Sequence, residues 1–151
     1  MRLYVIAAFA LTIATSLAAQ SGPDLSITPA QPGNWTYSPT ADGSESVFTD
    51  ANSIPQLWLH CTRSNRGVTV SRATTAAAPA LNVWTSTTVQ DVPATFDATS
   101  SRLSFRKPAY DPIFDAMAFS RGRIGVAIGT ATPLVVPPWE EVARVIEDCR
   151  A

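Results

Sequence analysis

Alternating apolar and polar positions predict strands through the middle of the chain. The clearest run covers residues 55–62, where Leu57, Leu59 and Cys61 share one face. Trp58, His60 and Thr62 share the other face. Shorter strands are expected at residues 34–37, 46–49, 68–72, 80–87, 102–106, 123–129 and 133–136. Turn-forming clusters at residues 50–53 and 64–67 separate the first of these strands.

The spacing changes to a helical period near the C-terminus. Asp111 and Pro112 suit the start of a short helix, and Gly122 suits its end. A closing helix is expected after Pro138, with its apolar stripe formed by Trp139, Val142, Ala143, Ile146 and Cys149. That stripe directs Cys149 toward the core.

These elements predict a mainly β protein with C-terminal helices. Seven or so short strands, then a helix, a strand and a closing helix, are typical of a small antiparallel β-sandwich or half-barrel. We divide the chain into a signal peptide at residues 1–19, a flexible N-terminal segment at residues 20–33 and a single β-rich domain at residues 34–151.

The N-terminus has the pattern of an export signal. Arg2 precedes an apolar run of about 15 residues, and small residues around Ala18 and Ala19 suit signal-peptidase cleavage. A membrane anchor is the alternative, but the run is shorter than the ~20 residues that span a bilayer. We therefore expect a periplasmic or secreted protein with no membrane span after cleavage.

Export makes the two cysteines informative. Two cysteines in a small exported domain usually pair, and Cys61 and Cys149 both lie on predicted inward faces. The alternatives are two buried thiols or a redox pair, although a redox pair generally uses closer spacing. We expect a structural disulfide that ties the terminal helix to a central strand.

Charge argues against a nucleic-acid partner. Removing residues 1–19 leaves 132 residues with 10 basic and 12 acidic side chains, a net charge of −2. A nucleic-acid-binding domain normally has a basic excess.

Candidate catalytic residues are few. His60 is the only histidine, and a general base would need a partner and a pocket. A half-buried strand histidine is the alternative. We expect no metal site, because two bonded cysteines and one histidine do not supply zinc ligands, and no cofactor or catalytic residue is assigned.

Two surface features remain as candidate binding sites. Trp58, His60 and Trp84 are expected as neighbours on the outer face of paired strands, as an aromatic patch for a protein, peptide or glycan. The alternative is that the N-terminal segment covers them through Trp35 and Tyr37.

Arginines form the second candidate. A rim that binds an anionic group is expected from Arg102, Arg106, Arg121 and Arg123. Alternating strands and helix ends also carry such arginines without a binding role.

The tail carries a resemblance. The run from Ala116 to Arg123, followed by Trp139 and the Cys149-Arg150 pair, resembles small exported alphaproteobacterial proteins of unknown function. The layout of a short helix, a strand and a terminal helix ending in cysteine is also similar to the invasion-associated locus B family. The resemblance covers the last third of the chain. It implies a periplasmic β-rich domain with a cysteine-tethered tail and no enzymatic activity.

We therefore expect a non-catalytic binding or inhibitor-like module for an envelope or foreign macromolecule, such as an envelope protein or glycan. The alternatives are a small hydrolase that uses His60 and a structural envelope component.

Overall fold

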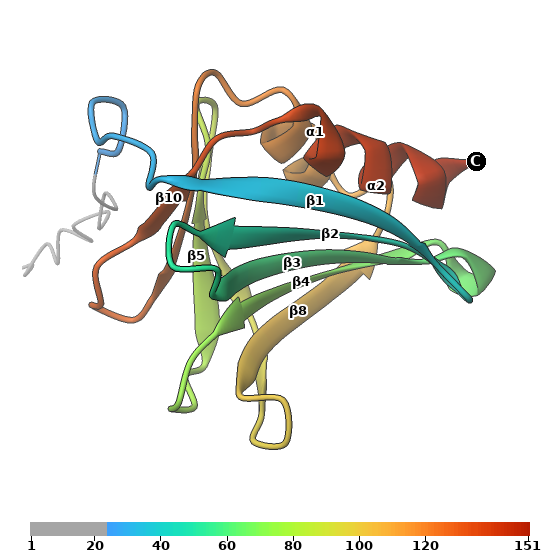
Figure 1. Cartoon of the computed structure of the whole chain (residues 1–151), viewed down its shortest axis with the longest axis horizontal. Coiled ribbons are helices and arrows are strands. Elements are labelled where there is room, and N and C mark those ends of the chain that lie inside the picture. The colour runs from blue at the N-terminus through green and yellow to red at the C-terminus, as the bar shows by residue number, and fades with distance from the viewer. Residues whose placement is uncertain (1–23) are drawn as a thin grey trace, which may run out of the picture.

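Two antiparallel sheets form the body of the protein (Figure 1). The computed structural model describes residues 24–151, so the expected signal peptide lies outside the described residues. The fold class is the expected one: mainly β, with a terminal helix joined to a central strand by a disulfide. The β-sandwich, and not a half-barrel, is the arrangement found.

The larger sheet has six strands in the order β1-β2-β3-β4-β8-β7. Their bounds are β1 Gly33–Thr40, β2 Gly43–Asp50, β3 Pro55–Thr62, β4 Gly67–Ala73, β7 Thr95–Asp97 and β8 Arg102–Pro108. A 3₁₀ turn, η1 Arg63–Asn65, joins β3 to β4. The predicted alternation is confirmed, since Leu57, Leu59 and Cys61 are fully buried.

The smaller sheet has four strands in the order β10-β9-β5-β6. Their bounds are β5 Ala80–Trp84, β6 Val89–Pro93, β9 Ile124–Ile128 and β10 Leu134–Val136. The strands β6 and β7 were not predicted from the sequence. Both strands are mostly exposed edge strands, so they lack a clear apolar face.

The first helix, α1 Pro112–Ala118, begins as expected. The Asp111 side chain accepts a hydrogen bond from the backbone N–H of Ile113 at 3.1 Å, and Pro112 occupies the first turn. Lys107 donates to the same carboxylate at 2.9 Å, which joins the end of β8 to the helix.

The terminal helix, α2 Glu140–Arg150, contacts β1, β2 and β3 (Figure 1). Its inward residues are Val142, Val145, Ile146 and Cys149. Trp139 is not one of them: it is the N-cap, and its side chain is 43% exposed. The expectation that Trp139 shares the inward stripe was wrong, because the helix begins one residue later.

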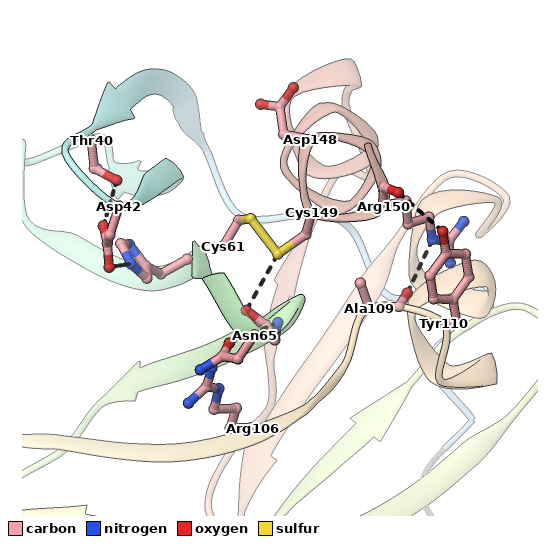
Figure 2. The surroundings of a disulfide bond; sticks show 12 residues. Thr40, Asp42, Cys61, Asn65, Arg106, Ala109, Tyr110, Asp148, Cys149 and Arg150 are labelled. Carbon is pink, nitrogen blue, oxygen red and sulfur yellow. Dashed lines mark hydrogen bonds and ion pairs between the residues drawn. A yellow bond between two sulfur atoms is a disulfide. The ribbon is translucent and has the colours of Figure 1, made fainter. Parts of the chain in front are cut away.

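The disulfide joins Cys149 on α2 to Cys61 on β3 (Figure 2). Their Cα atoms are 5.4 Å apart, within the usual range for this bond, and both residues are fully buried. This disulfide suggests an oxidising, non-cytoplasmic environment.

The inner face of the larger sheet is covered in two parts. The helix α2 packs on the end that holds Cys61. The smaller sheet approaches the other end, where Arg72 and Ala73 of β4 line a common surface with Val126 and Ile128 of β9. One large core cluster results, which joins residues of both sheets and both helices.

Residues 24–32 pack against the smaller sheet, where the sequence analysis expected a flexible segment. Leu25 is 5% exposed and forms a small cluster with Trp84 and Val135. A Cβ atom on Gly125 would lie within 2.2 Å of Leu25, so glycine is required for this approach.

Candidate functional site

The candidate site is centred on an arginine that lies on the inward face of a strand. Arg72 of β4 lies in one cross-strand row with Leu57 and Leu103, both fully buried. Neighbours in such a row point to the same side of a sheet, so the Arg72 side chain points between the two sheets. It lies at the opposite end of β4 from the η1 turn.

Arg72 lines a cleft of about 440 Å³ between the sheets, which we call the inter-sheet cleft. Its other lining residues are Ala73, Thr74, Ala76, Val126, Ile128, Thr130, Ala131 and Thr132. The segment from β4 to β5 crosses between the sheets here, and the turn from β9 to β10 forms the facing wall. The volume is within the range of small-ligand sites.

The guanidinium of Arg72 has only amide partners. Its Nη1 donates to the side-chain oxygen of Gln56 at 2.9 Å and to the backbone carbonyl of Gln56 at 3.3 Å. The amide nitrogen of Gln56 donates in turn to Asp50 at 2.9 Å. Gln56 thereby holds the guanidinium in place without neutralising it.

No carboxylate among residues 24–151 forms an ion pair with Arg72. Burial lowers the pKa of Arg72, because partial removal from water disfavours the charged form. An arginine side chain nevertheless stays protonated in proteins. The inter-sheet cleft therefore contains a fixed positive charge whose counter-charge is not supplied by the described residues.

Hydroxyl groups surround the mouth of the cleft. The Thr74 hydroxyl accepts from the N–H of Ala76 and donates to its carbonyl, both at 3.2 Å, which shapes the segment after β4. Thr130 and Thr132 are exposed on the facing turn. Chemically, the site offers one cation, hydroxyls at its entrance and apolar walls.

The aromatic patch expected on paired strands does not exist. Trp58 lies on β3 in the larger sheet and Trp84 on β5 in the smaller one, so the two do not share a face. The guanidinium carbon of Arg102 lies 3.6 Å from the Trp58 ring centre. Leu25 packs on Trp84. Both indoles are below 10% exposed, and neither offers a free aromatic surface.

The alternative expectation, in which Trp35 and Tyr37 cover the aromatic patch, was also wrong. Trp35 and Tyr37 lie on β1 beside α2 and not over Trp58 or Trp84. The indole N–H of Trp35 donates to the carbonyl of Pro137 at 2.8 Å. The Tyr37 hydroxyl donates to Asp148 at 2.6 Å, so these rings fasten the terminal helix.

The four candidate arginines do not form one rim. Arg102 and Arg106 lie on β8 of the larger sheet, whereas Arg121 and Arg123 precede β9 of the smaller one. Arg106 donates to Asn65, and Arg123 donates to the backbone carbonyl of Ser26. These contacts give structural roles to Arg106 and Arg123, and the expectation of one rim formed by all four arginines was wrong.

His60 lies on the outer face of β3 between two carboxylates. Its Nε2 is 3.2 Å from Asp42, and its Nδ1 is 3.7 Å from Glu45. Thr40 also bonds Asp42, as Figure 2 shows. Hydrogen bonds from Thr40 and then from His60 hold the pKa of Asp42 below its usual value. A general base needs a ring nitrogen directed at a substrate or nucleophile, and here both nitrogens face carboxylates.

The described part of the chain contains no group of three or more His, Cys, Asp or Glu side chains placed to hold a metal ion. Within residues 24–151, no helix has the length and apolar character needed to cross a membrane.

Comparison with known proteins gives no relative. No family model, curated protein or solved structure matches the chain. The resemblance of the tail to exported proteins therefore remains a prediction, and the site has to be interpreted from its own geometry.

None of the residues of the inter-sheet cleft was predicted from the sequence to be a site residue. A signal was present, because Arg72 follows Val68 and Val70 in the alternation and shares their inward face. An arginine at an inward position is unusual and marks either a buried ion pair or a binding site.

Proposed function

We propose that this protein is a non-catalytic binding module of the periplasm or the extracellular space. Its inter-sheet cleft receives an acidic group of another macromolecule, and an envelope protein is the partner class that we favour. The buried disulfide and the export pattern of residues 1–19 both support a location outside the cytoplasm.

The observation that carries this proposal is the unpaired charge of Arg72. Partial burial of a cation without a counter-ion lowers stability, since desolvation is not compensated by attraction. The same chain pairs another half-buried arginine fully: Arg150 contacts Asp115 at 2.8 Å and Glu147 at 3.1 Å. Among the described arginines, Arg72 is the one whose pKa is lowered by burial, and a partner that brings its own negative charge compensates that burial.

The framework around the cleft also suits a binding role. Gln56 fixes the guanidinium through two hydrogen bonds, and the cleft walls belong to strands of both sheets. A site held on rigid elements loses little conformational freedom when a partner binds. Recognition, and not turnover, is what one preoriented cation with apolar walls can perform.

Site-specific photocrosslinking in the native host tests the proposal. A photoreactive phenylalanine analogue at Thr75 lies on an exposed loop between two lining residues, Thr74 and Ala76, and does not itself line the cleft. The same analogue at the exposed Arg63, in η1 at the far end of the larger sheet, is the control.

We expect a discrete adduct from position 75 that is absent from position 63 and disappears when Arg72→Gln is added. Equal crosslinking from both positions, or no adduct from position 75, contradicts a cleft-centred binding role.

A further inference from the structure

We infer that the inter-sheet cleft binds a single carboxylate carried on a short apolar group, with the carboxylate on Arg72 and the apolar part between the sheets. This inference rests on the proposed function and names the chemical group that the cleft recognises.

The free edge of the Arg72 guanidinium has the shape of a carboxylate partner. Nη1 is occupied by both oxygens of Gln56. The described residues provide no hydrogen-bond acceptor for Nε or Nη2, which leaves one edge of the planar group available. Two parallel N–H groups on such an edge match the two oxygens of a carboxylate.

The charge of the cleft selects a monoanion. Arg72 is the only charged residue that lines it. One carboxylate is neutralised by one guanidinium, whereas a doubly charged phosphate would enter with a negative charge left unpaired in a partly desolvated space. Phosphate is therefore disfavoured in this cleft, although arginine side chains bind phosphate in many other proteins.

The walls select the rest of the ligand. Val126 is buried, Ile128 is half-buried, and Ala73, Ala76 and Ala131 complete the apolar lining. The alanines keep the cleft wide where a larger side chain would fill it. The hydroxyls of Thr130 and Thr132 at the mouth can bond to amide groups or water. A chain of a few carbon atoms fits between them and Arg72.

Two sources supply this chemistry. The C-terminal residue of a polypeptide presents a carboxylate beside a small apolar side chain, and its amide groups would then meet the threonines at the mouth. A free short-chain acid presents the same carboxylate and apolar part without amides. Both place the anion on Arg72, and the ligands used in the test distinguish them.

Calorimetric titration with amide-resolved NMR on the oxidised full domain tests the inference. The probes are hexanoate against hexan-1-ol, and acetyl-Ala-Ala-Val with a free carboxylate against the same peptide amidated. Arg72→Gln removes the cation, and Arg63→Gln removes an equal charge at the distant turn.

We expect each acid to bind about 10- to 100-fold more tightly than its neutral counterpart, the effect of charge-assisted hydrogen bonds. Shifts should map to residues 72–76 and 126–132. Arg72→Gln should abolish this preference, and Arg63→Gln should leave it intact. A tighter peptide acid identifies a chain end as the source, whereas a tighter hexanoate identifies a free acid and contradicts the macromolecular partner of the proposed function.

Ala76→Trp is a second variant that leaves Arg72 and Gln56 untouched and fills the cleft from an exposed position. This variant should weaken the binding of both acids, and it tests the inference even if Arg72→Gln unfolds the domain. Equal affinity for acid and neutral probe, shifts outside the cleft, or full binding by the Ala76→Trp variant overturns the inference. If the acids do not bind while the adduct from position 75 persists, the proposed function stands and only the carboxylate assignment falls.

Discussion

Removing the disulfide should lower the stability of this domain strongly. The bond closes a loop between residues 61 and 149, which are 88 positions apart. In the chain-entropy treatment, a loop of that length restricts the unfolded chain by about 4.6 kcal/mol at 25 °C. A domain of this size typically has only ~5–15 kcal/mol of stability in total. The double variant Cys61→Ala/Cys149→Ala should therefore lose roughly a third to nine-tenths of the stability of the wild type.

Chemical denaturation of the wild type and three alanine variants measures this effect. Either single substitution already breaks the bond, so the second should add little, about 1 kcal/mol for a lost buried sulfur. Cys61→Ala, Cys149→Ala and the double variant should thus have similar midpoints. Two single losses that add up in the double variant, or a total loss below about 1 kcal/mol, would refute the idea that the covalent link is what stabilises the fold.

Three further predictions concern local contacts. Gly43→Ala places a Cβ atom 2.1 Å from the Cys61 carbonyl oxygen, so β2 and β3 must separate and stability should fall by about 1–3 kcal/mol in urea unfolding. Asp111→Ala removes the α1 cap and should cost about 1 kcal/mol. Burial raises the pKa of Asp111, but hydrogen bonds from Lys107 and Ile113 outweigh it and the pKa is lowered. The stabilisation by Asp111 is therefore present above the unfolded pKa of about 3.9 and lost as pH falls through the folded pKa. In an acid titration, the free energy of unfolding should therefore fall less for Asp111→Ala than for the wild type. His60→Ala should change the free energy of unfolding by less than about 0.5 kcal/mol, whereas loss of a hydrolytic activity in that variant would favour the hydrolase hypothesis.

Much of the fold follows from local patterns. Alternation at residues 55–62 identified β3 with its observed ends, and the helical stripe placed Cys149 inward. When two cysteines lie on two inward faces of a small exported domain, their pairing is nearly determined. The expected disulfide was confirmed because both local patterns were strong.

Strand order is where the sequence becomes insufficient. Trp58 and Trp84 both alternate outward, but only the pairing of strands shows that they belong to different sheets. Their covers also come from distant segments, Arg102 in one case and Leu25 in the other. Such contacts depend on long-range packing, which one-dimensional periodicity does not encode.

The binding site was missed for a related reason. Arg72 occupies a position in the alternation that points toward the core, and its role depends on which residues face it from the other sheet. A carboxylate on β9 would have made it a structural ion pair. Val126 and Ile128 stand there instead, and this apolar wall turns an ordinary charge into a candidate for recognition.

The packing of Leu25 on Gly125 sets a limit on maturation. Exopeptidases that shorten the N-terminus past Leu25 would uncover the indole of Trp84. With cleavage expected after Ala18 or Ala19, only a few residues of sequence separate the expected cleavage point from Leu25. A tag or fusion partner joined directly to Leu25 would therefore lie close to the smaller sheet and needs its own linker.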